Sequence, residues 1–265
     1  MNYLDTLSSA ARERITNSKQ LIPADEMMYM ALSMPDGTFD FETSLSKKKL
    51  SIIAECKKAM PDVGDIAEGH HIVETASELE DAGAACLSIV TEPVYFRGCR
   101  DHMRLITNEV SIPCLRKEAI IDEYMIYESK IIGAKAVLLI AVMLSDDELR
   151  NYIRICDTLG ISAFVETYSE DDIRRALKAG ARIITVDNRD MRDCSMDDGR
   201  YLRLRDKVPD DVIYVAEGGI STPEHIRLLR EAGIDAAVIG TALMRAPDRT
   251  AKLRELLGKK SVCSV

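Results

Sequence analysis

A repeated unit constrains this chain more than any other feature of its sequence. In each copy an amphipathic segment ends in an apolar residue and a glycine, and a short apolar run follows. The glycine can adopt the positive φ of a helix C-terminus, and the run is too short for a helix and too continuous for a half-exposed strand. Such runs are typical of buried parallel sheets. The glycines and the runs after them are Gly83 and 86–90, Gly133 and 136–140, Gly160 and 162–165, Gly180 and 182–186, and Gly233 and 236–239.

Similar runs without the glycine occur at 51–54, 112–115 and 212–216. Together the runs give eight strands over about 215 residues, roughly 27 per β/α unit, which matches a (β/α)8 TIM barrel. We therefore predict an α/β fold with a TIM barrel over residues 51–258, and a doubly wound open sheet is the alternative. Residues 1–50 are predicted to form an N-terminal helical extension packed on the barrel, and residues 259–265 a flexible tail.

Composition limits the classes of partner. The chain is 46% hydrophobic and 30% charged with a formal net charge of −9, so we expect a globular protein that does not bind nucleic acid. No apolar run approaches the roughly 20 residues of a membrane span, and the first residues do not resemble a signal peptide. We expect no membrane partner and a cytoplasmic location, and the oligomeric state stays open. Seven cysteines and four histidines show no metal-ligand spacing, so free thiols and no metal site are expected.

Charged residues stand where the predicted strands end. In a TIM barrel these ends converge on one cavity, which holds the active site. Two lysines among three glutamates in a poorly solvated site would shift each other's pKa values, which suits acid and base chemistry without a metal. A Schiff-base lysine also stays open. The charged strand-end residues are Glu55, Lys57, Lys117, Glu166, Asp187, Arg189 and Glu217.

The last two predicted strands are followed by sequences that suit phosphate binding. Gly218 and Gly219 follow the run 212–216, and Gly240 and Thr241 follow the run 236–239. Backbone N–H groups at glycines and helix N-termini bind phosphate without net positive charge. Because the chain has no GxGxxG or Walker sequence, the predicted ligand is a phosphorylated small molecule rather than a nucleotide.

Several motifs resemble those of the indole-3-glycerol phosphate synthase family, TIM-barrel enzymes of tryptophan biosynthesis. The likeness runs from about Leu50 to Leu257 and is strongest at 53–58, 114–117, 120–124, 136–140, 220–224 and 242–245. The family closes the pyrrole ring of 1-(2-carboxyphenylamino)-1-deoxyribulose 5-phosphate, with loss of CO₂ and water and without a cofactor. The resemblance therefore implies a carboxy-lyase, a phosphorylated substrate and no cofactor.

The resemblance also implies roles for individual residues. Lys117 would be the general acid acting on the ribulose carbonyl, and Glu166 would donate or accept a proton in the later dehydration. Lys57 would lie near the carboxylate, ring or phosphate of the substrate, with Glu55 and Glu217 positioning lysines and hydroxyl groups. The phosphate would be held by Gly219, Gly240 and Thr241.

The chain departs from the family pattern at positions expected to touch substrate. The motif at 60–62 is Met-Pro-Asp rather than Ser-Pro-Ser, and the motif at 117–119 is Lys-Glu-Ala rather than Lys-Asp-Phe, which removes an aromatic wall. Asp187 replaces an asparagine and Gly218 replaces a serine. The residues expected to bind substrate are Ala119, Asp187, Arg189 and Gly218.

The carboxylate of Asp187 matters most among these changes, because it would repel a substrate that carries a carboxylate and a phosphate. Either Asp187 is paired with Lys117 or Arg189, or the substrate differs. The charged residues favour the family reaction. The alternative is a paralogue that acts on a different phosphorylated, amino-sugar-type substrate. A non-catalytic barrel subunit is disfavoured, because such a site has no physical reason to keep these charges.

Overall fold

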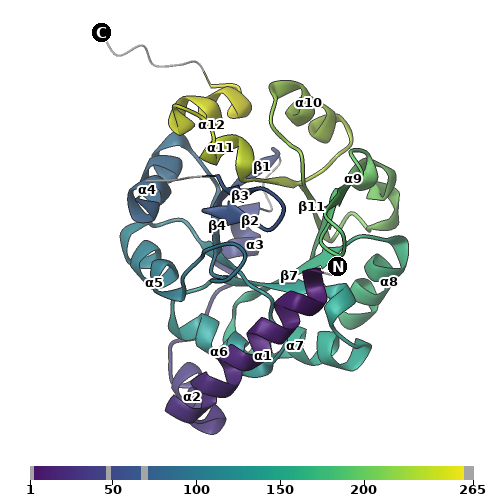
Figure 1. Ribbon diagram of the computed structural model, residues 1–265. Coiled ribbons are helices and arrows are strands. Elements are labelled where there is room, and N and C mark those ends of the chain that lie inside the picture. The colour runs from purple at the N-terminus through teal and green to yellow at the C-terminus, as the bar shows by residue number, and fades with distance from the viewer. Residues whose placement is uncertain (1–2, 46–48, 67–70, 260–265) are drawn as a thin grey trace.

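The computed structural model describes residues 3–45, 49–66 and 71–259, so of the predicted tail only Lys259 is described. Its centre is a closed barrel of parallel strands with helices around it (Figure 1). In order around the barrel the strands are β1 Ser51–Cys56, β4 Cys86–Val90, β5 Cys114–Lys117, β6 Ala136–Ile140, β7 Ser162–Thr167, β8 Ile183–Asp187, β11 Ile213–Glu217 and β12 Ala236–Ile239. Strand β12 closes the barrel on β1. The predicted TIM barrel is confirmed, and the open sheet is excluded.

The strands begin and end at somewhat different residues from the predicted apolar runs. The run at 112–115 begins as a strand only at Cys114, because Pro113 before it has no N–H to give to a sheet. Several strands extend past the apolar residues, and as a result Glu55, Glu166 and Glu217 lie inside β1, β7 and β11 rather than in loops. Their side chains are therefore held by rigid sheet.

The helices that connect the strands lie outside the barrel. Predicted glycines end several of them, with φ values of +105° at Gly83, +65° at Gly160 and +93° at Gly180. No helix in the described part of the chain is long and apolar enough to cross a membrane. The helices after β1 are α4 Ile72–Ala82, α5 Arg100–Glu109, α6 Glu123–Ile131, α7 Asp146–Leu159, α8 Glu170–Ala179, α9 Arg200–Arg203, α10 Pro223–Glu231, α11 Thr241–Met244 and α12 Arg249–Leu257, with 3-10 turns at Ala141–Met143 and Arg205–Lys207.

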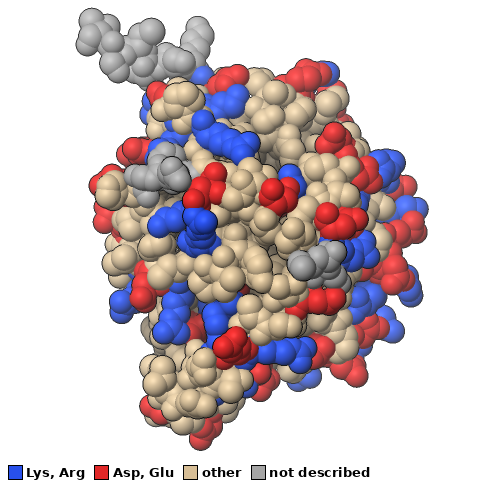
Figure 2. All heavy atoms as spheres, in the orientation of Figure 1, with Lys and Arg blue, Asp and Glu red and all other residues tan. Residues whose placement is uncertain are grey.

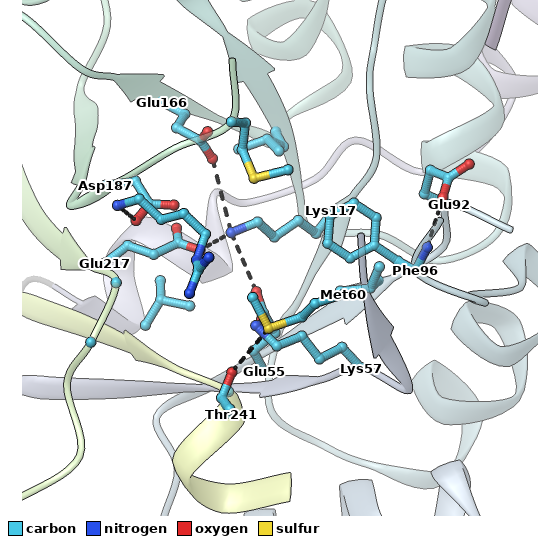
Figure 3. Close-up of a pocket in the computed structure, with 18 of the residues that line it drawn as sticks. Glu55, Lys57, Met60, Glu92, Phe96, Lys117, Glu166, Asp187, Glu217 and Thr241 are labelled. Atoms are coloured by element: carbon cyan, nitrogen blue, oxygen red, sulfur yellow. Dashed lines mark hydrogen bonds and ion pairs between the residues drawn. The ribbon is translucent and has the colours of Figure 1, made fainter. Parts of the chain in front are cut away.

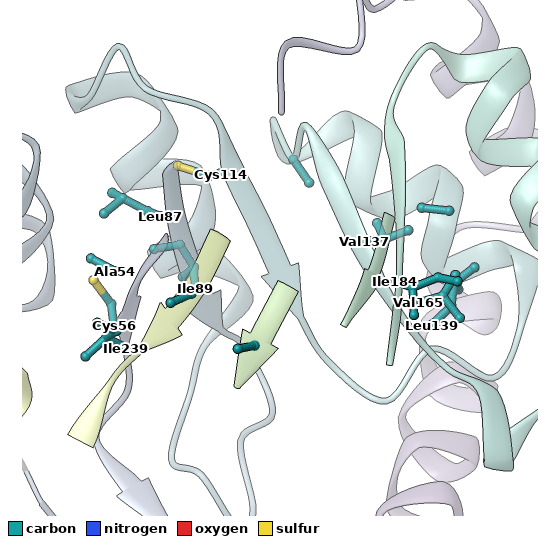
Figure 4. Packing of buried hydrophobic residues seen from close by; sticks show 14 of the residues in the cluster. Ala54, Cys56, Leu87, Ile89, Cys114, Val137, Leu139, Val165, Ile184 and Ile239 are labelled. Carbon is teal, nitrogen blue, oxygen red and sulfur yellow. The ribbon is translucent and has the colours of Figure 1, made fainter. Parts of the chain in front are cut away.

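Two apolar layers follow from the alternation of side chains along each strand. In β1, Ile52 and Ala54 point outward and pack with the helices, whereas Ile53 points into the barrel. Figure 4 shows the outer layer, in which Leu139 of β6 lies beside Val165 of β7. Both faces of the strands are buried, which is why the sequence shows continuous apolar runs.

The first residues form α1 Tyr3–Leu21, α2 Ala24–Leu32 and α3 Asp40–Leu45. Helix α1 crosses the face of the barrel where the strands end (Figure 1), and its Leu7 lines the cavity there. Helix α3 lies at the opposite end, where the fully buried Phe41 packs edge-on against Phe164 with ring centroids 6.0 Å apart. The N-terminal helices thus contact both ends of the barrel.

Two short hairpins that the sequence did not predict stand over the strand ends. They are β2 Ala59–Met60 with β3 Gly64–Asp65, and β9 Arg189–Asp190 with β10 Ser195–Met196. The Arg189 guanidinium joins them through an ion pair of 2.6 Å to Asp62. Over the face shown in Figure 2, basic and acidic side chains are interspersed.

Candidate active site

The barrel opens at the carboxyl ends of its strands into a cavity of about 460 Å³ (Figure 3). A cavity of this size suits a ligand of several hundred daltons. Every site residue named from the sequence lines this one cavity: Glu55, Lys57, Lys117, Ala119, Glu166, Asp187, Arg189, Glu217, Gly218, Gly219, Gly240 and Thr241.

Lys117 occupies the centre of the charged floor. From the end of β5 its ammonium group contacts Glu217, lies 3.3 Å from Glu55 Oε2 and lies 3.9 Å from Glu166 Oε2. Burial lowers the pKa of Lys117, but the carboxylates of Glu55, Glu166 and Asp187 outweigh burial and raise it. Lys117 is therefore protonated at neutral pH and can serve as a proton donor.

Glu55 holds the second lysine of the floor. Its Oε1 lies 2.5 Å from Lys57 Nζ, and its other oxygen faces Lys117. Burial raises the pKa of Glu55, but the two ammonium groups overcome burial and lower it to about 2. Glu55 is thus ionised at neutral pH and fixes the position of both lysines.

Glu166 is the deepest carboxylate on the β7 side, with 1% of its surface exposed. Its Oε1 accepts a hydrogen bond from the hydroxyl of Tyr168, and its Oε2 faces Lys117. Tyr168 was not predicted from the sequence. Side chains alternate along an extended segment, so the residue two positions after Glu166 is expected on the same face.

For Asp187 the structure excludes one of the two alternatives. Among the described residues, its carboxylate forms no ion pair with Lys117 or Arg189. Lys117 contacts the glutamates, the guanidinium of Arg189 contacts Asp62, and Asp187 Oδ1 accepts instead from the backbone N–H of Arg189 at 2.8 Å. Burial first, and Glu166 second, raise the pKa of Asp187 to about 7.

Gly218 leaves room for the carboxyl of Asp187. Its φ is +88°, and a Cβ at this position would collide with Asp187 Oδ1 and approach the backbone of Arg189. The glycine and the aspartate at these two positions are therefore linked sterically, and neither replacement can be understood alone.

The side of the cavity that the sequence predicts to bind phosphate is built from the ends of β11 and β12. Gly219 has φ +77°, and a side chain at Gly240 would meet Glu55 and Lys57, so the backbone of both lies open to the cavity. The hydroxyl of Thr241 donates to Met60 Sδ at 3.4 Å. Met60, one of the departures from the family pattern, thus covers this side.

Carboxyl oxygens of Glu166, Asp187 and Glu217 lie within 4.8 Å of one another, a spacing that a cation can bridge. The ammonium of Lys117 already contacts two of these three groups. The donor set therefore matches the acid and base chemistry read from the strand ends.

The family model and the similar sequences all indicate one family. The profile of the indole-3-glycerol phosphate synthase family matches residues 4–256. The chain belongs to this family. Indole-3-glycerol phosphate synthases of Lachnoclostridium phytofermentans and Endomicrobium trichonymphae are 38% and 41% identical to it, and each match covers 96% of this chain and 98% of the relative. The resemblance stated from the motifs is confirmed.

Solved structures of more distant proteins share the fold of this indole-3-glycerol phosphate synthase family member. A 3-hexulose-6-phosphate synthase from Salmonella typhimurium superposes with a TM-score of 0.65 at 16% identity, covering 78% of this chain and 96% of that one. A thiamine phosphate pyrophosphorylase from Pyrococcus furiosus gives 0.59 at 16% identity, covering 80% and 95%. These likenesses establish the barrel.

The cavity has an apolar wall that could not be predicted from the sequence. Phe96, in the loop after β4, lines the same cavity as Ala119, so the cavity has an aromatic ring although position 119 carries none (Figure 3). Glu92 holds that loop by accepting the N–H groups of Tyr95 and Phe96. No local pattern marks these residues, because they reach the cavity through the path of a loop.

Proposed function

We propose that this chain closes the pyrrole ring of 1-(2-carboxyphenylamino)-1-deoxyribulose 5-phosphate with loss of CO₂ and water, the reaction of the family to which it belongs. The observation that carries the proposal is the ammonium of Lys117, which stands among three buried carboxylates at the floor of a cavity with an apolar wall. The cavity volume suits a phosphorylated arylamino sugar.

Ring closure needs a proton donor at the ribulose carbonyl. As the ring carbon attacks this carbonyl, its oxygen becomes a hydroxyl with a proton from Lys117, and loss of CO₂ then restores the aromatic ring. In the following dehydration the hydroxyl takes up a proton and leaves as water, and a neighbouring carbon loses a proton. Glu166 donates or accepts a proton in this step. Glu55 and Glu217 hold Lys117 in place for both steps.

The anionic groups of the substrate occupy the remaining sides of the cavity. The ammonium of Lys57 faces the carboxylate, ring or phosphate of the substrate, and Arg189 adds a second cation at the mouth. Backbone N–H groups at Gly219, Gly240 and Thr241 hold the phosphate, as at the ends of the last two strands of many TIM barrels.

The test is conversion of this substrate to its indole product, followed by fluorescence. The chain has no Trp to contribute background. We expect turnover that inorganic phosphate inhibits competitively, and weaker binding of a dephosphorylated analogue. If the wild type is inactive but the double variant Asp187→Asn with Ala119→Phe is active, the natural substrate is a different one. If both are inactive, the ring-closing function is wrong.

A further inference from the structure

The floor of the cavity holds more carboxyl groups than ammonium groups. The four carboxyl groups of Glu55, Glu166, Asp187 and Glu217 are all buried, and within the described residues only Lys57 and Lys117 form ion pairs with them. Glu55 faces both lysines, while Glu166 and Glu217 share Lys117. Burying an unpaired carboxylate is costly, so an acid without a cation tends to keep its proton. Asp187 is the acid that these ion pairs leave out.

The other groups around Asp187 do not supply that missing charge. The guanidinium of Arg189 faces Asp62, and only its backbone N–H reaches Asp187 Oδ1. Arg200 donates to the backbone carbonyl of Asp187 at 2.8 Å, and its guanidinium pairs with Asp190 and Asp197. Asp187 Oδ2 has no hydrogen-bond partner within the described chain, and Asp187 lines the cavity.

Asp187 and Glu166 are close enough to compete for one proton. Their carboxyl oxygens lie within 4.8 Å of each other and of a carboxyl oxygen of Glu217, and carboxylates this close in a poorly solvated site repel one another unless a cation neutralises them. Glu166 has two partners that Asp187 lacks, the hydroxyl of Tyr168 and the ammonium group of Lys117. The proton therefore belongs on Asp187, in agreement with the raised pKa of this group.

We infer that Asp187 is protonated in the resting enzyme and that its Oδ2 donates a hydrogen bond to an anionic oxygen of the substrate. The inference rests on the proposed ring closure and names a specificity-determining residue for it. A neutral carboxylic acid removes the repulsion that a carboxylate would impose on an anionic substrate, and it forms a strong hydrogen bond to such a group. An asparagine amide at position 187 could make the same bond at every pH, whereas the acid makes it only below its own pKa.

The first measurement needs no substrate. Carbon-13 NMR of the aspartate carboxyl groups in the folded enzyme should show one group that titrates near neutral pH, and this signal should be missing in Asp187→Asn. In Glu166→Gln the same group should titrate at lower pH, because its negative neighbour is gone. If no aspartate of the wild type titrates in this range, the inference is wrong.

The second measurement is the pH profile of ring closure. Above the pKa of Asp187, kcat/KM of the wild type should fall by about tenfold per pH unit, because the donor is lost. Asp187→Asn should lack this fall, and Asp187→Ala should be weak at every pH. Equal alkaline limbs in the wild type and Asp187→Asn would overturn the inference. If no variant forms the indole product while the NMR titration is present, the proton on Asp187 stands and the proposed reaction fails.

Discussion

A single ammonium group, that of Lys117, contacts three carboxylates that have almost no access to water. We expect Lys117→Ala to lower kcat for ring closure by about 10²–10⁴-fold, because the proton donor is lost. Lys117→Arg should be similarly slow, since a guanidinium keeps the positive charge but does not release a proton near neutral pH. Circular dichroism should show that both variants fold, and normal turnover in either would remove Lys117 from the proton transfer.

A second expectation at the residue scale concerns the contact between Gly218 and Asp187. Gly218→Ala introduces a Cβ at φ +88° that collides with Asp187 Oδ1, whereas Gly180→Ala introduces one at φ +93° with no atom within 4 Å. The control therefore measures the cost of positive φ alone, on the order of 1 kcal/mol. Urea unfolding should show a larger loss for Gly218→Ala. Equal losses would mean that the two side chains do not constrain one another.

At the scale of elements, α1 is fastened to the barrel by Arg14. Its guanidinium lies 3.3 Å from Glu92 and 3.0 Å from Glu118, whose side chains are 3% and 2% exposed. Arg14→Ala leaves two buried carboxylates without this cation, and we expect a loss of about 1–3 kcal/mol in the free energy of unfolding, less than for a fully buried pair because Arg14 is partly exposed. Arg12→Ala on the exposed side of α1 should cost less than about 0.5 kcal/mol, as measured by urea unfolding.

The sequence predicts the barrel but not the position of α1. The barrel strands and the charged residues at their ends could be predicted, because a buried parallel strand leaves a continuous apolar run and barrel geometry brings the ends together. The position of α1 over the cavity could not, since Arg14 contacts Glu118, which is 104 residues away in the chain, and no local pattern encodes that contact. Of the two alternatives for Asp187, the ion pair with Lys117 or Arg189 is absent, because these two cations contact Glu217 and Asp62 instead, and the sequence does not show which carboxylate a cation contacts.

At the scale of the whole molecule, the buried acids make stability depend on pH in two opposite ways. The pKa of Glu55 is lowered to about 2, so its contribution is present above its ordinary value of 4.5 and is lost as the pH falls toward 2. The pKa of Asp187 is raised from 3.8 to about 7, so its contribution is present below 3.8 and is lost as the pH rises through 7.

This sign leads to a thermal measurement. Between pH 5 and pH 8 the wild type should lose the contribution of Asp187, whereas Asp187→Asn has none to lose, so the Tm of the variant should rise relative to that of the wild type. The exposed loop residue Asp36 provides the control, and Asp36→Asn should keep a constant difference in Tm. A constant difference for Asp187→Asn as well would contradict the buried proton.

Helix α3, which covers one end of the barrel, limits the order in which the chain can assemble. Phe41 packs on Phe164, and Glu42 pairs with Arg182, which lies 140 residues further along the chain. Helix α3 precedes both of these partners in the chain, so it can contact them only after Arg182 has been translated. A nascent chain that stops before Phe164 lacks β8, β11 and β12, so its barrel cannot close, and Phe41 has no aromatic partner. Helix α3 can therefore complete its packing only after the first five barrel strands have been translated.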